Sequence, residues 1–297
     1  MSSLKDFAVK GDKKIKLKQF ATAPDDSISK EKIIRKTQEN LEKMERFQDR
    51  LYSEGKEGLV LIFQAMDAAG KDSTIKNVMR GLNPQGIDVY SFKQPSGEEA
   101  AHSFLWRAIK CFPTRGKMAI FNRSYYEDVL VVKVHKLYET AKIPNRCKQG
   151  NVIERRYTDI KNFEEYEYNN GYRIIKFFLN VSKDEQKKRF LERIDLKIKN
   201  WKFSSSDLKE RAHWDEYMKA YEAAINATAT KHSPWYVLPA DKKWYTRYLV
   251  SEAVLDVFKK IAPQYPELEE DAQQRLQADR ELLTTEEQPK QKVKAEQ

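Results

Sequence analysis

The order of apolar and polar residues along the chain predicts strands that alternate with helices. Residues 59–63 form a continuous apolar run of strand length, typical of a central strand buried on both faces of a parallel sheet. Four further segments are expected to be strands: 88–92, 118–121, the apolar run within 172–181, and 235–238. The pattern therefore predicts an α/β fold, with a five-stranded parallel sheet between two layers of helices.

Apolar residues recur every three or four positions between these strands, which predicts helices. The longer expected helices cover residues 29–53, 98–112, 152–169, 207–230 and about 244–261. A shorter helix is expected after residue 71. Another begins at Ser182, which has Glu185 three positions later in a capping-box pattern.

These elements predict one domain with an extension at each end. An N-terminal extension and its helix cover residues 1–54, the core covers 55–263, and an acidic tail covers 264–297. We expect residues 1–26 to be irregular. The tail has no apolar periodicity after Leu283, so we expect it to be mobile.

The net charge narrows the classes of molecule that the protein is expected to bind. The whole chain carries +10 and residues 266–297 carry −4, so residues 1–265 carry +14. A domain this positive attracts polyanions such as nucleotides, polyphosphate, nucleic acid or anionic lipid, although a solvated lysine-rich surface gives the same charge. The sequence shows no apolar stretch of membrane-spanning length, no signal-peptide core and only two isolated cysteines. We therefore expect a reduced, cytoplasmic protein without a membrane partner.

The loop after the first expected strand reads Ala-Met-Asp-Ala-Ala-Gly-Lys-Asp and is close to the phosphate-binding pattern G-x-x-x-x-G-K-[ST]. Gly70 and Lys71 fit that pattern, whereas the first and last positions of the loop depart from it. Backbone N–H groups at a helix N-terminus bind phosphate oxygens, and Lys71 adds a full positive charge. Asp67 would repel a phosphate unless a divalent cation lay between them, so we interpret it as a Mg²⁺ ligand. The alternative is that Gly70 only forms a tight turn.

The exit of the third expected strand, Asn-Arg-Ser-Tyr-Tyr-Glu-Asp, is densely polar. The forked guanidinium of Arg123 suits a bridge between donor and acceptor phosphates. In P-loop kinases a carboxylate on a neighbouring strand helps hold the metal. Here Asn122 can coordinate the metal or orient a metal-bound water but carries no charge, and Glu127, one turn further on, is a further candidate. The alternative is an ordinary helix start in which Arg123 pairs with Glu127 or Asp128.

A basic segment between the fourth and fifth expected strands is the third candidate. In small P-loop kinases this position holds a mobile lid whose arginines close over the transferring phosphate, so we expect a helical lid at about 184–212. Arg189 and Arg193 are its candidate catalytic residues. A solvated charged helix is the usual meaning of such a run. The basic residues of the segment are Lys187, Lys188, Arg189, Arg193, Lys197, Lys199 and Lys202.

A long polyanion needs a track of cations beyond one loop, and we expect Lys76, Arg80 and Lys93 to supply it. The loop and the start of its helix are expected to contact phosphate directly, through Ala68, Ala69, Gly70, Lys71, Asp72 and Ser73. The four histidines show no metal-ligand spacing. The aromatic residues between 201 and 236 are expected to belong to the core.

Four motifs in sequence order resemble the polyphosphate kinase 2 family over about residues 30–262. They are the loop at 65–72, Phe-Asn-Arg-Ser-Tyr-Tyr-Glu-Asp-Val at 121–129, Trp-Lys-Phe-Ser at 201–204, and Ser-Pro-Trp-Tyr-Val at 233–237. The resemblance implies a thymidylate-kinase-like P-loop fold and Mg²⁺-dependent phosphoryl transfer between inorganic polyphosphate and nucleotides. It also implies dimers or tetramers and allows Mn²⁺ in place of Mg²⁺.

Carried over by position, Asp67 and Lys71 are the family's loop acid and lysine, and Arg123 is its strand-three arginine. Arg189 and Arg193 resemble its lid arginines. Many members have Asp where this chain has Asn122. The form found here is similar to the class III subgroup, which accepts both nucleoside mono- and diphosphates.

The resulting hypothesis is a polyphosphate-driven kinase that phosphorylates AMP and ADP. Two alternatives stay open. One is a nucleotide kinase with ATP as its donor, which the extended series of lysines disfavours. The other is a polyanion- or nucleic-acid-binding protein with a degenerate P-loop, for which the sequence shows no recognition helix or aromatic-rich RNA motif.

Overall fold

A computed structural model describes residues 3–286, and its centre is a six-stranded sheet with the order β1-β6-β5-β2-β4-β3. Five strands run parallel, whereas β1 pairs antiparallel with β6. The strands are β1 Ala8–Val9, β2 Gly58–Gln64, β3 Ile87–Ser91, β4 Met118–Asn122, β5 Tyr172–Asn180 and β6 Trp235–Pro239. The α/β class and the five expected strands are confirmed.

The prediction of a five-stranded, wholly parallel sheet is wrong by one strand. Ala8 pairs with Tyr236 and Val9 with Trp235, within a segment that the sequence predicted to be irregular. A strand of two residues is too short to show a period of two. This segment is a strand only because it pairs with the edge of β6, and that edge forms only when the chain folds.

Strand β2 lies at the centre of the sheet, and this position explains its apolar sequence. Leu61 faces Ile120 of β4 on one side and Ile175 of β5 on the other, and every residue of β2 is buried. A parallel strand covered on both faces has no solvated side that would favour polar residues. The loop after β2 therefore emerges at the middle of the sheet's carboxyl edge, where ligands bind in open α/β sheets.

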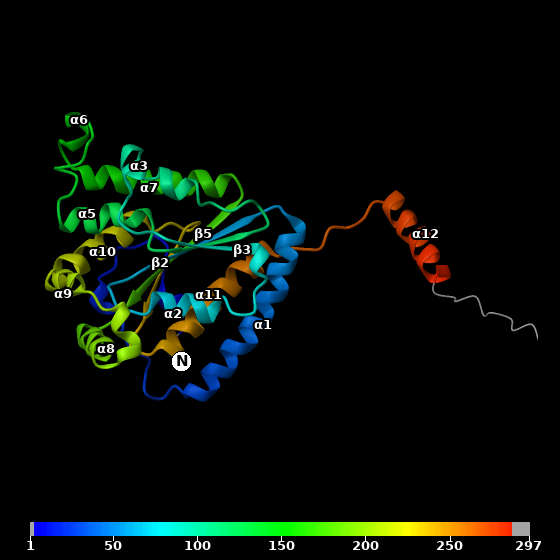
Figure 1. The fold of residues 1–297 in the computed structure, drawn as a ribbon, viewed down its shortest axis with the longest axis horizontal. Helices are drawn as coiled ribbons and strands as arrows, with labels where there is room; N and C mark the ends of the chain where they lie inside the picture. The colour runs from blue at the N-terminus through cyan, green and yellow to red at the C-terminus, as the bar shows by residue number, and fades with distance from the viewer. Residues whose placement is uncertain (1–2, 287–297) are drawn as a thin grey trace, which may run out of the picture.

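Helices cover both faces of this sheet (Figure 1). In that view α5 and α7 lie above the sheet, and α1, α2 and α11 lie below it. Helix α1 packs along α11, and α10 packs on α7. Their bounds are α1 Lys30–Glu54, α2 Lys71–Val78, α5 Val131–Val134, α7 Val152–Asn169, α10 Trp214–Thr228 and α11 Lys243–Ile261.

Two long helices expected from the sequence are broken. Residues 98–112 form α3, Gly97–Ala101, and α4, Trp106–Ile109, because the chain is extended at His102, whose ring stacks on Trp106. Residues 207–230 form α9, Ser205–Ala212, and α10, separated at His213. The spacing of apolar residues at every third or fourth position continues across each break. The sequence pattern therefore predicts one long helix where the structure has two.

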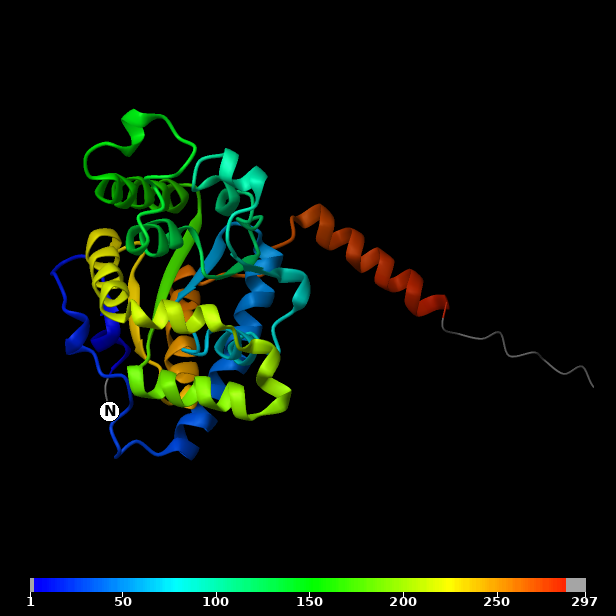
Figure 2. The same ribbon diagram turned by 60° about the vertical axis from the view of Figure 1, so that its left-hand side comes forward.

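Helices α8, Lys183–Asp195, and α9 lie close together at one end of the domain, joined by the 3₁₀ helix η5, Lys197–Lys202. Figure 2 shows them in yellow-green at the front of the molecule. Short helices complete the fold: η1 Leu4–Phe7, η2 Leu17–Gln19, η3 Pro84–Gly86, η4 Tyr125–Val129 and α6 Asn145–Lys148.

The predicted acidic tail contains a helix, α12, at Glu270–Glu286. In both views α12 stands apart from the body of the domain on an extended connection. The last part of the tail, residues 287–297, lies outside the described residues. No helix in the described chain is long and apolar enough to cross a membrane.

Candidate active site

The loop between β2 and α2 turns its backbone around a phosphate-sized position. Ala68 has φ of 59° and Gly70 has φ of 106°, and α2 begins with the Thr74 N–H donating to the Gly70 carbonyl. Positive φ is ordinary for glycine but costs an alanine energy, so the surrounding structure must hold Ala68 in this conformation. The result is a strand–loop–helix turn with the start of a helix pointing at the site.

Lys71 is the first residue of α2, and its side chain is buried at the base of the loop. Its Nζ donates a hydrogen bond of 2.9 Å to the Ala65 carbonyl. Burial lowers the pKa of Lys71 to about 8, although Asp67, Glu127 and Asp72 each favour its charged form. A bound anion would further favour the charged form of this lysine.

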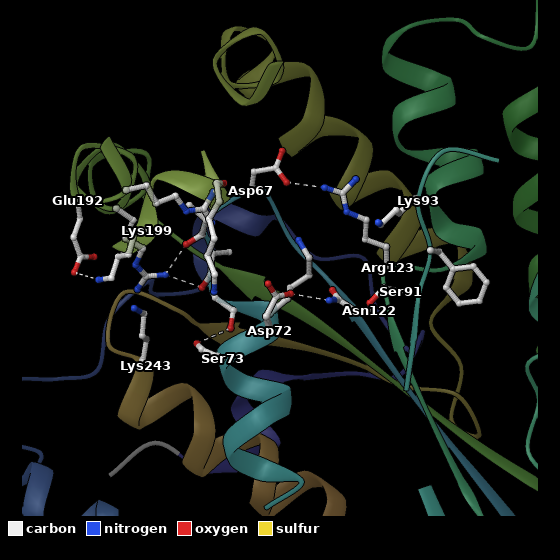
Figure 3. A pocket seen from close by; sticks show the side chains of 18 of the residues that line it. Asp67, Asp72, Ser73, Ser91, Lys93, Asn122, Arg123, Glu192, Lys199 and Lys243 are labelled. Atoms are coloured by element: carbon white, nitrogen blue, oxygen red, sulfur yellow. Dashed lines mark hydrogen bonds and ion pairs between the residues drawn. The ribbon is translucent and has the colours of Figure 1, made fainter. Parts of the chain in front are cut away.

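Asp67 and Arg123 meet across the site. The Arg123 Nη2 lies 2.7 Å from the Asp67 Oδ1 (Figure 3). Its Nη1 lies 3.8 Å from the Glu127 Oε2. Burial opposes the charge on Arg123, but Glu127 and Asp67 outweigh it and raise the pKa of the guanidinium above its ordinary value. Burial raises the pKa of Glu127, against the lowering effect of Arg123 and Lys71. Arg123 is therefore a permanent cation held between two carboxylates.

Asn122 turns toward the start of α2 and donates a 2.7 Å hydrogen bond to Asp72 (Figure 3). Two of the positions at which this sequence departs from common patterns, Asp72 and Asn122, are thus partners. With Asp67 they place oxygen atoms from three side chains around the loop.

Among residues 3–286, no group of three or more His, Cys, Asp or Glu side chains could hold a metal ion. This arrangement still fits Mg²⁺, which binds one or two carboxylates and takes its other ligands from phosphates and water.

A cavity of about 560 Å³ lies beside the loop and is strongly basic. It is lined by the loop, by Asn122 and Arg123 of the sheet edge, and by cations from four further segments, namely the residues after β3, α8, η5 and α11: Lys93, Arg189, Arg193, Lys199, Lys202 and Lys243. Lys243, at the start of α11, is absent from the sequence-based candidates. The sequence does carry a signal for this residue, because a pair of lysines follows shortly after the last strand. The exit of that strand lies at the same edge of the sheet as the other candidate residues.

Lys76 and Arg80 do not line the basic cavity, and both are exposed. An α-helix turns by about 100° per residue, so Lys76 points about 140° away from Lys71. Arg80 follows the end of α2. The structure therefore does not bring Lys76 and Arg80 to the basic cavity, which Lys199, Lys202 and Lys243 line instead.

The two lid arginines predicted from the sequence have different surroundings. Arg193 lines the cavity and contacts Asp207, at 3.3 Å, and the Lys202 carbonyl. Arg189 is only 6% exposed, and its guanidinium is fully occupied by protein acceptors. Arg189 therefore has no donor left for a phosphate in this conformation, contrary to the role that the resemblance implied.

A second cavity of about 520 Å³ lies on the other side of the Asp67–Arg123 pair. It shares Asp67, Phe92, Lys93, Gln94 and Arg123 with the basic cavity. Its remaining wall mixes apolar and polar side chains, among them Val131, Val132, Leu137, Tyr221, His135, Asp207, Glu210 and Tyr217. Sequence reasoning assigned the tyrosines to the core and His135 to no site, because helices distant in sequence bring these residues together.

A contact between two helices shapes this second cavity. Glu210 of α9 accepts hydrogen bonds from the Tyr217 hydroxyl of α10, at 2.5 Å, and from the His135 Nε2, at 2.8 Å. These hydrogen bonds lower the pKa of Glu210, although burial alone would raise it. The wall of the second cavity therefore presents an ionised carboxylate, a hydroxyl group and an imidazole beside apolar surface.

Comparison with known proteins identifies the family of this chain. The family model described as "Polyphosphate kinase 2 (PPK2)" matches residues 27–266. The "ADP-polyphosphate phosphotransferase" of Rhodopseudomonas palustris is 45% identical over 89% of this chain and 92% of its own length. The "AMP/ADP-polyphosphate phosphotransferase" of Meiothermus ruber is 43% identical over 90% of this chain and 97% of its own.

A solved structure is similar over nearly its whole length. The crystal structure of polyphosphate kinase 2 from Arthrobacter aurescens TC1 superposes with a TM-score of 0.83 at 35% identity, covering 94% of this chain and 97% of the other. Sequence family, relatives and fold agree over the same region. The chain belongs to the polyphosphate kinase 2 family.

Proposed function

We propose that this protein transfers phosphoryl groups between inorganic polyphosphate and nucleotides, forming ATP from ADP, and ADP from AMP, when polyphosphate is the donor. The observation that carries this proposal is the pair of cavities that meet at Asp67 and Arg123. A transfer reaction needs two substrates whose reacting phosphates approach one another. The names of the two relatives indicate the same donor and acceptors.

The basic cavity suits polyphosphate. Its cations come from the loop and from α8, η5 and α11, so they surround a groove. A polyphosphate chain carries charge at regular intervals and has no other feature to recognise, so a series of lysines and arginines is sufficient to bind it. Lys199, Lys202 and Lys243 take the role that the sequence assigned to Lys76 and Arg80.

The second cavity suits a nucleotide. Its apolar residues and tyrosines offer surface to a base and ribose, and its polar groups offer hydrogen-bond partners. With a base in this cavity, the terminal phosphate points toward Arg123 and the phosphate loop.

We assign Mg²⁺, or alternatively Mn²⁺, to the side-chain carboxylate of Asp67 in the phosphate loop. Asn122 and Glu127 are further candidate ligands. Held there, the ion would supply positive charge that offsets the negative charge of the phosphates during transfer. Residues of the chain bind and orient the transferring group. Lys71 and Arg123 stabilise charge on the transferring group, and loop N–H groups orient it. An ionised acceptor phosphate needs no strong general base.

We further propose that residues 184–212 act as a lid that closes on the polyphosphate side, with Arg193 approaching the transferring phosphate. Closure excludes water, which would otherwise hydrolyse the activated phosphate. The assignment of a P-loop kinase fold to residues 55–263 rests on the loop's position after β2. A dimer or tetramer, as the resemblance implies, is part of the same proposal.

One assay distinguishes this proposal from its alternatives. The protein is incubated with polyphosphate, Mg²⁺ and ADP or AMP, and ATP formation is followed; a parallel reaction contains ATP and AMP without polyphosphate. The proposal predicts ATP formation that depends on polyphosphate. Activity only with ATP as donor would indicate an ordinary nucleotide kinase. Tight DNA binding with no transfer would indicate a nucleic-acid-binding protein.

A further inference from the structure

Arg189 forms an unusually complete set of hydrogen bonds. It lies two turns after Ser182, the N-cap of α8. Its Nε donates to Glu185 at 2.9 Å, its Nη1 to the carbonyls of Ala68 and Ala69 at 3.0 and 2.7 Å, and its Nη2 to those of Ala240 and Asp241 at 2.7 and 3.1 Å. A guanidinium has five N–H donors, and here all five are used.

The acceptors belong to two different segments of the chain. Ala68 and Ala69 belong to the phosphate loop, whereas Ala240 and Asp241 lie between β6 and α11. The guanidinium therefore joins the loop to the neighbouring strand exit through one planar group. Lysine carries the same charge but has three donors on a single atom and no fork, so it cannot join these acceptors in the same geometry.

A neighbouring side chain on α8 extends this pattern. The Gln186 Nε2 donates to the Asp67 carbonyl at 2.9 Å, so the carbonyls of three consecutive loop residues face α8. Gln186 in turn accepts a 2.6 Å hydrogen bond from Arg211 of α9. The loop is thus attached to the base of the lid along its whole outer side.

These bonds have a direct consequence for anion binding. In a trans peptide the N–H points opposite to the C=O of the same unit. Where the carbonyls of Asp67 and Ala69 turn toward α8, the N–H groups of Ala68 and Gly70 turn away from it, while the Ala69 N–H between them donates to the Met66 carbonyl. Backbone N–H groups that share one side of a loop attract an anion. The same bonds hold Ala68 at its unfavourable φ of 59°.

We propose that Arg189 is a positioning residue that holds the phosphate loop in its anion-binding conformation through the carbonyls of Ala68 and Ala69, and not a residue that contacts the transferring phosphate. The expected effect of Arg189 on turnover rests on the proposed function, whereas its expected effect on the conformation of the loop does not. Arg193, one turn further along α8 and lining the basic cavity, is the matched residue for comparison.

The test compares Arg189→Lys with Arg193→Lys in the full-length protein. Amide hydrogen exchange is measured by mass spectrometry on peptides covering residues 65–71, without substrate. We expect faster exchange in this segment for Arg189→Lys and exchange as in the wild type for Arg193→Lys. In the polyphosphate assay, Arg189→Lys should lower kcat about 100-fold, because small misplacement of catalytic groups has effects of this size.

Three outcomes decide the matter. Faster exchange at 65–71 together with reduced kcat supports the proposal. Reduced kcat with unchanged exchange at 65–71 overturns it, because Arg189 would then act on the substrate directly. Wild-type kcat in Arg189→Lys also overturns it. If the wild type itself forms no ATP from polyphosphate, the proposed function fails, and the exchange result still decides the role of Arg189.

A second variant covers the case in which Arg189→Lys does not fold. Glu185→Ala leaves the guanidinium in place and removes only the acceptor of its Nε, on a side chain that is 24% exposed. We expect a smaller increase in exchange at 65–71 and a several-fold lower kcat. Exchange in this segment identical to that of the wild type overturns the proposal.

Discussion

The two cavities on either side of Asp67 and Arg123 are nearly equal in volume but differ in character. The first, of about 560 Å³, is lined mainly by lysines, arginines and the phosphate loop. The second, of about 520 Å³, combines apolar residues and tyrosines with a similar number of acidic and basic groups. A polymer of identical charged units needs cations spaced along its path, whereas a nucleotide needs a shaped wall for its base. This difference is the basis on which we propose polyphosphate for the first cavity and the nucleotide for the second.

The largest expected effect on turnover comes from the phosphate loop, which lines the basic cavity. Lys71→Met removes the loop cation and should lower kcat about 1,000-fold, equivalent to about 4 kcal/mol of transition-state stabilisation. Because an apolar side chain of similar volume replaces a buried lysine, the fold should be retained. Initial rates of ATP formation measure the loss, with thermal unfolding as the control. Activity near that of the wild type would remove the loop from the mechanism.

Asp67→Asn should lower kcat about 100-fold, because it weakens the pair with Arg123 and the site assigned to the metal. It should also raise the Mg²⁺ concentration needed for half-maximal rate. A Mg²⁺ titration of initial rates tests both effects. Asp72→Asn is the matched comparison, since Asp72 lies beside Asn122 and not beside Arg123. An unchanged Mg²⁺ requirement in Asp67→Asn would contradict the metal assignment.

The pH dependence should reflect the protonation of Lys71. Burial lowers its pKa to about 8, so the free enzyme loses this charge as the pH rises through 8. If the charged form is required, kcat/KM for polyphosphate should fall about tenfold per pH unit above that value. Bound phosphate favours the charged form, so the alkaline limb of kcat should lie at higher pH. Rates measured from pH 6 to 10 test this, and a flat profile to pH 10 would be inconsistent with it.

The basic cavity is tested by Lys243→Ala. We expect the KM for polyphosphate to rise about tenfold, equivalent to about 1.4 kcal/mol, and the KM for ADP to stay the same. Added salt should weaken the effect, because it screens partly exposed charges. Lys76→Ala is the control, since Lys76 lies outside both cavities. Equal effects of the two variants would mean that overall charge, and not the cavity, binds polyphosphate.

The smallest expected effect lies in the mixed cavity. Tyr217→Phe removes one hydrogen bond to Glu210, worth about 1 kcal/mol. The KM for ADP and AMP should rise a few-fold, while the KM for polyphosphate stays unchanged. Steady-state kinetics with each substrate varied in turn provides the measurement. A change in the KM for polyphosphate instead would reverse the assignment of the two cavities.

The sequence predicted those parts of the site that depend on neighbouring residues. The apolar run at 59–63 indicated a central strand, and Gly70 with Lys71 indicated the loop, because both signals are local. Lys76 was misjudged because its direction depends on which face of α2 is buried. Lys243 and Tyr217 were missed because they reach their cavities only through the packing of distant helices. Arg189 illustrates the same limit, since its carbonyl acceptors exist only in the folded chain.

The most direct test of the two-sided site is equilibrium binding to the double variant Lys199→Ala/Lys243→Ala. Isothermal titration calorimetry measures polyphosphate and ADP separately, each without the other substrate. The account predicts that the Kd for polyphosphate weakens at least tenfold while the Kd for ADP matches that of the wild type. Equal weakening for both ligands, or weakening for ADP alone, would contradict it.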